Sequence, residues 1–215
     1  MNALKSILSV LLFITLAIGF EACKKDDVAP VTLTGNTIKD LAADPPSGGY
    51  NSMNGQPIGV TNKYTLFSFK TGAQVANTDS VSSKWDIGFN GTKIIVNGGT
   101  SGPGSAAALV QPGLFDQIMV APEVGYSQDN KSASPAFYAI TRGSGNGWYK
   151  YDQTTNLIFP KAGAVLIFKT ADAKYAKMEI QSYYKGAPAA PTSTTADRYY
   201  TFRYVYQGDG TTKLN

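Results

Sequence analysis

Residues 198–207 read RYYTFRYVYQ, and this run decides the fold class of the chain. Every second residue is aromatic, at Tyr200, Phe202, Tyr204 and Tyr206. Successive side chains of a β-strand point to opposite faces, so this spacing places four rings on one face. The period is two rather than the 3.6 of a helix. We therefore expect a long strand whose aromatic face packs on a core.

Shorter runs of the same kind precede it. They cover residues 64–69 (YTLFSF), 84–89 (KWDIGF), 93–96 (KIIV), 164–169 (AVLIFK) and 175–180 (YAKMEI). Trp85, Ile87 and Phe89 alternate, so we expect them to share the core with the aromatic run. Residues 164–169 are almost continuously apolar, which is typical of a strand covered on both faces. The patterns predict an all-β chain with a single-domain antiparallel sandwich or barrel-like sheet.

Composition sets the expected boundaries. Residues 23–62 are rich in breakers, including DPPSGG at 44–49, and are expected to form a partly ordered linker with an early strand near 31–33. The β domain is expected over residues 63–215. Short helical turns are expected, if anywhere, near 37–43 or 105–110, because the rest lacks an amphipathic helical period.

The N-terminal segment has the pattern of a secretory signal. Lys5 is followed by an uncharged apolar run at 7–20, and a small residue precedes Cys23, the only cysteine. The run is too short for a comfortable transmembrane helix, which needs about 20 apolar residues. The segment resembles a bacterial lipoprotein signal over residues 1–22, after which Cys23 becomes the lipidated N-terminus. An ordinary signal peptide with an incidental cysteine is the alternative.

Four charged residues directly follow the expected lipid site: Lys24, Lys25, Asp26 and Asp27. This run resembles the surface-export tag of some Gram-negative lipoproteins. Two or three acyl chains on one cysteine anchor a protein stably, whereas a single chain gives only marginal membrane binding. We therefore expect a protein that is held on the outer membrane through its lipid and exposed at the cell surface.

The chain contains no histidine, which excludes whole classes of chemistry. Ser–His and Cys–His nucleophilic pairs cannot form, nor can histidine-ligated metal sites. The net charge is only +4 and no basic stripe tracks phosphates, so nucleic acid is not an expected partner. We expect a binding protein rather than an enzyme.

Three local features offer sites. The loop at 97–104 (NGGTSGPG) could cradle an anion, but a tight connection after a strand is the simpler interpretation. Asp86 and Asp152 could form a catalytic carboxylate pair, although nothing in the sequence makes them face each other. The aromatic cluster at 148–151 (WYKY) follows several glycines and could line a pocket for a flat ligand, or simply belong to the core.

Together the pieces resemble the HmuY family of haem-binding surface lipoproteins. The similarity covers residues 64–207 and rests on the order and spacing of FSFKTG at 67–72, WDIGF at 85–89, NGGTSG at 97–102, Trp148-Tyr149, and the strand pair at 165–180. The resemblance implies an all-β fold, a haem ligand and delivery of haem to an outer-membrane receptor.

The known iron ligands of the family are histidine or methionine, and the corresponding segments here hold neither. The resemblance therefore leaves haem as the expected cofactor without histidine ligands. The pocket candidates are Met119, Tyr126, Tyr138, Trp148, Tyr149 and Tyr151. Another planar or hydrophobic small ligand, or a surface module for glycan or protein in nutrient uptake, is the alternative.

Overall fold

The computed structural model describes residues 33–215. The signal segment, Cys23 and the charged tag at 24–27 lie outside the described residues. In the described part, regular structure consists of strands and two short 3-10 turns, η1 (Asn77–Asp79) and η2 (Phe115–Gln117). No helix in this part is long and apolar enough to cross a membrane.

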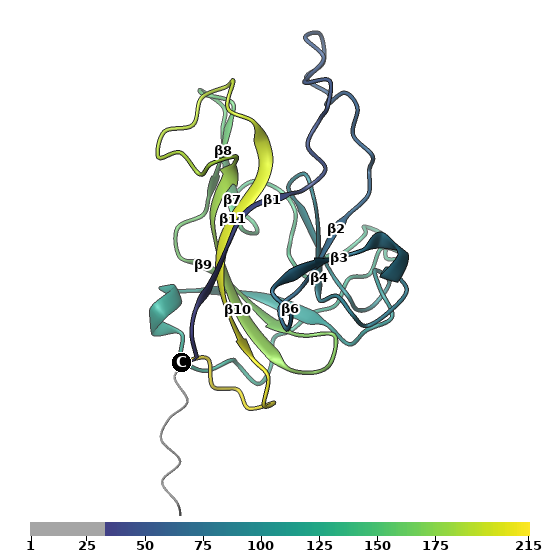
Figure 1. Cartoon of the computed structure of the whole chain (residues 1–215), viewed down its shortest axis with the longest axis vertical. Helices are drawn as coiled ribbons and strands as arrows, with labels where there is room; N and C mark the ends of the chain where they lie inside the picture. The colour runs from purple at the N-terminus through teal and green to yellow at the C-terminus, as the bar shows by residue number, and fades with distance from the viewer. Residues whose placement is uncertain (1–32) are drawn as a thin grey trace, which may run out of the picture. The chain divides into compact units, whose positions relative to one another are not determined.

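The larger sheet has five antiparallel strands in the order β1-β11-β10-β9-β6 (Figure 1). The strands are β1 (Asn36–Ala42), β6 (Ala107–Pro112), β9 (Ala164–Lys169), β10 (Tyr175–Tyr184) and β11 (Asp197–Gln207). The opening aromatic run forms β11, and the run at 164–169 is β9. Both expectations are confirmed.

The second sheet has four antiparallel strands in the order β3-β2-β4-β5, and a separate hairpin pairs β7 with β8. Their bounds are β2 (Thr65–Ser68), β3 (Ala73–Val75), β4 (Ile87–Asn90), β5 (Lys93–Val96), β7 (Tyr149–Asp152) and β8 (Leu157–Pro160). The predicted all-β antiparallel sandwich is therefore confirmed.

An aromatic layer joins the two sheets. Phe67 of β2 meets Phe202 of β11 edge to face at 5.3 Å, and Phe89 of β4 meets Tyr200 at 4.7 Å. Edge-to-face and tilted contacts of this length are favourable between rings because of their quadrupoles. The alternating face of β11 thus supplies the main core, as its sequence predicts.

The opposite face of the five-stranded sheet is also covered. Val165 and Ile167 of β9 pack there against Phe115 and Ile118 from the η2 segment. This second cluster explains why β9 is apolar on both faces. The side chain of Lys177 is 3% exposed on this face, and its Nζ donates to the carbonyls of Phe115 at 2.9 Å and Ile118 at 2.7 Å.

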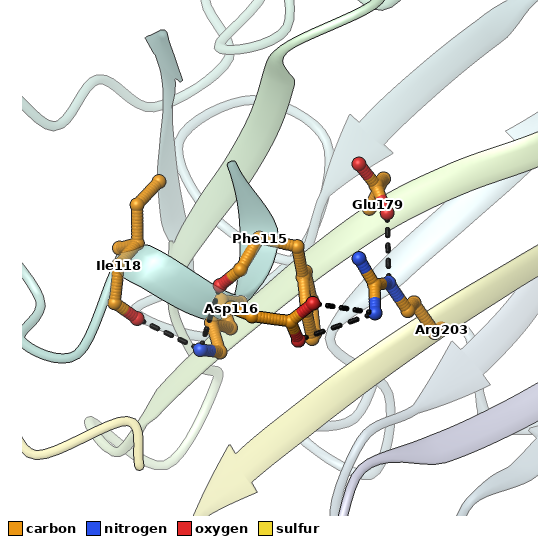
Figure 2. A network of polar contacts seen from close by, with 6 residues as sticks. Phe115, Asp116, Ile118, Glu179 and Arg203 are labelled. Carbon is orange, nitrogen blue, oxygen red and sulfur yellow. Dashed lines mark hydrogen bonds and ion pairs between the residues drawn. The ribbon is translucent and has the colours of Figure 1, made fainter. Parts of the chain in front are cut away.

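Arg203 also contacts the η2 segment, and we call the contacts of Lys177 and Arg203 with this segment the clamp. The Arg203 Nε donates to Glu179 at 2.7 Å and its Nη1 to Asp116 at 3.1 Å, as Figure 2 shows. The guanidinium also lies 4.3 Å from the centre of the Phe115 ring. Cation–π contact and charge-assisted bonds together fix the short turn on the sheet.

The expectation that Trp85 shares the main core is wrong. Trp85 is buried, but it packs with Leu66 and Ile95 on the outer face of the four-stranded sheet. The reason is that β4 begins only at Ile87. The alternation of a strand therefore does not extend back to Trp85.

The prediction of helical turns near 37–43 and 105–110 is also wrong, because these stretches contain the edge strands β1 and β6. A register shift in β1 puts Ile38 and Leu41 on the core side, three residues apart. A bulge of this kind imitates helical spacing. The expected linker thus contains a strand of the main sheet, which begins at Asn36. The early strand expected near 31–33 falls mainly on residues that lie outside the described part of the chain.

Candidate functional site

A cavity of about 630 Å³ lies at one end of the sandwich. Its walls come from an arm at residues 45–62, the β7–β8 hairpin and the loop 186–196 that leads into β11 (Figure 1). Four tyrosines line it, Tyr50, Tyr151, Tyr183 and Tyr184, together with Asp197 and Arg198. The size is within the range of small-molecule sites, about 300–1,000 Å³.

The arm is held by hydrogen bonds at its base and along its length. Asp44 accepts from the backbone N–H groups of Thr61 and Asn62, both at 2.7 Å, and from the amide of Asn90 at 3.1 Å. Burial alone would raise the pKa of Asp44, but these hydrogen bonds outweigh it and lower the pKa. Asp44 therefore remains an anion that fixes both ends of the arm.

A hydrogen bond from Tyr50 connects the arm to the start of β11 at the cavity. The Tyr50 hydroxyl donates to the carboxylate of Asp197, with distances of 2.7 and 2.6 Å to the two oxygens. Burial, and then the bond to Asp197, raise the pKa of Tyr50. The phenol thus keeps its proton at neutral pH and acts as a donor.

Tyr151 is the accessible phenol of the hairpin wall. Its side chain is 42% exposed, and its hydroxyl donates to the Asn156 side-chain oxygen at 2.6 Å. Its backbone N–H is bonded to the Ser144 hydroxyl at 2.8 Å. Asn156 has a positive φ of 59°, which a tight turn requires and which asparagine tolerates. The hairpin therefore presents Tyr151 and Asn156 as a pair.

The floor of the cavity rests on the core. Tyr183 is 2% exposed and packs on Trp148 at 5.7 Å and Tyr200 at 5.4 Å. The Trp148 indole N–H donates to the backbone carbonyl of Thr92, and Thr92 lines the cavity. Trp148 thus lies behind the pocket wall and supports it from the core.

The predicted pocket residues lie in different parts of the molecule. Met119 and Tyr126 are at the second cluster, on the far face of the five-stranded sheet. Tyr138 packs beside the Trp85 cluster, with the Arg142 guanidinium 3.4 Å from its ring centre. Tyr149 packs on Trp148 in a tilted contact, with ring centres 5.0 Å apart. Of the six candidates, Tyr151 alone lines the cavity.

The sequence-based prediction did not include Tyr50, Asp197 and Arg198. Tyr50 lies in the stretch that the composition predicts to be a linker, and its partner Asp197 is 147 residues away. A sequence pattern carries no signal for a contact at that separation. The local sequence indicates only that Tyr50 and Arg198 each follow a loop rich in breaker residues.

The glycine-rich loop at 97–104 is structural. The buried Asn97 amide donates to the carbonyls of Ser82 at 2.9 Å and Trp85 at 2.7 Å, and its oxygen accepts from Gly104. A Cβ on Gly102 would lie 2.1 Å from that oxygen, so only glycine fits. The loop wraps around Asn97, as the tight-connection interpretation requires.

The two carboxylates considered for catalysis have separate structural tasks. Asp86 accepts from the backbone N–H groups of Phe69 at 2.8 Å and Ala171 at 2.9 Å. Asp152 accepts from Thr154 and Thr155 in the hairpin turn. Within residues 33–215, no group of three or more acidic or other potential ligand residues is placed to hold a metal ion.

An aromatic pocket at the end of an antiparallel sandwich defines a class: an all-β protein with a site suited to a flat or apolar small molecule. The HmuY protein family matches residues 60–204, and the chain belongs to that family. The matched region includes the hairpin and β11 side of the pocket, whereas Tyr50 lies before it.

Solved structures with similarity to the chain come from several bacteria. An apo HmuY analogue from Tannerella forsythia is 15% identical, with a TM-score of 0.44, and the alignment covers 85% of this chain and 99% of that one. A proposed HmuY-like haem-binding protein from Bacteroides vulgatus is 16% identical, with a TM-score of 0.46 and coverage of 80% and 91%. A proposed lipoprotein from Bacteroides fragilis is 15% identical, with a TM-score of 0.49 and coverage of 80% and 89%. A comparison with curated proteins gave no match.

Proposed function

We propose that this protein binds haem or a related porphyrin in the aromatic pocket at the β7–β8 end. The observation that carries the proposal is the set of four tyrosines lining one cavity in a member of the HmuY family. Flat apolar rings pack well on aromatic faces. A solved HmuY-like relative is described as haem-binding, which supports the same ligand class here.

The residues of the pocket fit such a ligand chemically. Haem is a flat, mostly apolar ring that carries carboxylates, and its iron supplies a Lewis-acid centre. Tyr183 and Tyr184 form the buried floor of the pocket, the exposed ring of Tyr50 suits a face of the ligand, and the cation of Arg198 suits its carboxylates. The Arg198 Nη1 donates to the Asp44 carbonyl at 3.0 Å, and its buried Nε has no hydrogen-bond partner among the described residues.

Tyr151 is the residue we assign to hold the iron. A phenol oxygen is an established haem ligand in other proteins. Tyr50 is a weaker candidate, because its proton is held by Asp197 and its pKa is raised. Tyr126 does not line the pocket, and burial raises its pKa too.

The test is a spectroscopic titration of the Cys23→Ser chain with ferric haem, repeated after adding dithionite. A tyrosinate is a hard anionic oxygen and prefers ferric iron. We therefore expect a Soret shift in the ferric state that weakens on reduction. Stronger ferrous binding would instead indicate a soft thioether ligand, that is, a methionine. No shift in either state, at micromolar protein, would contradict the proposal.

A sugar is the second candidate ligand, because the pocket also carries hydroxyl and amide groups. Thr92, Asn156, Thr192, Ser193 and Thr195 contribute to its wall. Hydroxyl groups beside aromatic faces suit glycan binding. Glycan-dependent quenching of protein fluorescence in the absence of any Soret shift would favour this function over haem.

We further propose that the protein is a surface lipoprotein that passes its ligand to an outer-membrane receptor. The motive is Cys23 after the apolar run, with the tag at 24–27 behind it. Replacing Cys23 with serine should abolish acyl labelling and release the protein from membranes. Neutralising residues 24–27 should leave acyl labelling intact and reduce accessibility to added protease. Unchanged labelling of the serine variant would contradict the anchor, and unchanged accessibility would contradict the tag.

A further inference from the structure

We infer that an apolar patch beside the start of the described chain rests on the lipid bilayer and holds the ligand pocket away from it. The patch consists of Leu114, Met119, Val120 and Val124. The inference deepens the proposed function, because it rests on the lipid anchor at Cys23. The patch itself is an independent structural observation.

Four exposed apolar side chains lie close together in sequence, in a segment that also exposes Asp116 and Glu123. Leu114, Met119, Val120 and Val124 are 60%, 54%, 57% and 80% exposed. Soluble proteins normally scatter such residues singly over the surface. Here four of them fall within one segment of eleven residues.

The segment cannot hide these side chains by folding inward. Its other apolar residues, Phe115, Ile118 and Ala121, already fill the second cluster. Lys177 holds the carbonyls of Phe115 and Ile118, and backbone bonds pair Met119 and Ala121 with the C-terminal segment, so the backbone is fixed with the four side chains exposed. The patch is therefore preformed.

The chain enters the domain beside this patch. The Leu33 N–H donates to the Asn215 carbonyl at 3.2 Å, and the Leu214 N–H donates to the Met119 carbonyl at 2.7 Å. Leu33 also packs on the second cluster. Cys23 precedes Leu33 by ten residues, which can span at most about 33–36 Å. A lipid on Cys23 therefore holds the point where the chain enters, and the patch beside it, within about 33–36 Å of the bilayer, and the bilayer is the apolar partner that we assign to the patch.

The pocket lies at the other end of the molecule. Strand β11 begins at Asp197 in the pocket wall and ends at Gln207, whose side-chain amide donates to the Lys213 carbonyl at 3.0 Å. A strand of this length extends on the order of 30 Å. Figure 1 shows the arm and the 186–196 loop at the upper end, and the C-terminus at the lower end. Contact through the patch would turn the pocket outward, toward ligand and receptor.

The experiment places a fluorophore at matched exposed valines of the acylated full chain. Val124→Cys and Val81→Cys are labelled with an environment-sensitive dye; the two native side chains are 80% and 85% exposed. The acylated protein is reconstituted in vesicles of phosphatidylethanolamine and phosphatidylglycerol that contain a nitroxide-bearing lipid. We expect a blue shift and strong quenching at position 124, and neither at position 81. Adding Met119→Asp and Val120→Asp should restore the emission at position 124 while the protein still floats with the vesicles.

The outcomes separate this inference from the anchor. A protein that is not acylated and does not float would refute the anchor, and the inference with it. A protein that floats, but whose dye at position 124 behaves as at position 81, would overturn the inference and leave the anchor standing. Quenching that survives both aspartate substitutions would also overturn it, because the contact would then not depend on the patch.

Discussion

The body of the sandwich and the β7–β8 hairpin contain the same residue types but use them differently. Phe202 of β11 is fully buried, whereas Phe159 of β8 is 38% exposed. Tyr200 is also fully buried and donates to the Gly91 carbonyl at 2.8 Å, whereas Tyr151 stands 42% exposed at the pocket. The comparison shows that the aromatic residues of the body hold the fold, whereas the hairpin leaves Phe159 and Tyr151 partly exposed, with Tyr151 in the pocket wall.

The phenylalanines should give the largest difference between the two regions. Phe202→Ala removes a ring that contacts Phe67 and Phe89, and should lower the free energy of unfolding by about 3–5 kcal/mol. Phe159→Ala is the matched control and should cost less than about 1 kcal/mol. Urea unfolding of both variants measures this. Equal losses would remove the distinction between body and hairpin.

The aspartates should differ in the sign of their pH dependence. Burial outweighs the backbone hydrogen bonds of Asp86 and raises its pKa to about 6. The folded state then binds the Asp86 proton more tightly than the unfolded state, so this residue's contribution to stability falls as pH rises from about 4 to about 6. We therefore expect the difference in free energy of unfolding, wild type minus Asp86→Asn, to decrease by up to about 3 kcal/mol as the pH rises through this window.

Asp152 is the hairpin counterpart, and hydrogen bonds from Thr154 and Thr155 lower its pKa. Its contribution is present at neutral pH and is lost as pH falls below about 4. The difference between the wild type and Asp152→Asn should therefore rise with pH. Urea titrations between pH 3 and pH 7 compare the slopes, and slopes of the same sign would contradict the account.

The lysines should give a smaller effect. Lys177→Met keeps the buried stem but leaves two carbonyls of the η2 segment without their charged donor, which should cost about 2 kcal/mol. Lys150→Met on β7 replaces an exposed lysine and should cost less than about 0.5 kcal/mol. Hydrogen exchange at residues 115–118 should accelerate only in the Lys177 variant. Unchanged exchange there would show that the clamp does not stabilise the turn.

Much of the body was predictable from the sequence because its strands keep a strict period or a continuous apolar run. The aromatic run at 198–207 and the runs at 93–96 and 164–169 become β11, β5 and β9. Prediction failed at β1, where a bulge gives Ile38 and Leu41 helical spacing, and at Trp85, which precedes its strand. In each case the tertiary pairing, which leaves no local pattern, decided the outcome.

The pocket was much less predictable than the body. Tyr151 was a candidate because it follows glycines and another aromatic residue. Tyr50 and Asp197 meet only because the arm folds back over the start of β11, and no local pattern reports a contact across 147 residues. Loops that carry a site are positioned by the scaffold, so their partners emerge only from the fold.

The most direct test of the central claim is the ferric haem affinity of Tyr151→Phe compared with Tyr126→Phe. Both substitutions remove one phenol oxygen, but Tyr151 lines the pocket, and Tyr126 lies on the far face of the five-stranded sheet. We expect Tyr151→Phe to weaken ferric binding by at least about tenfold and to shift the Soret band, and Tyr126→Phe to match the wild type. Wild-type affinity in the Tyr151 variant, or a loss confined to the Tyr126 variant, would contradict the assignment of the pocket.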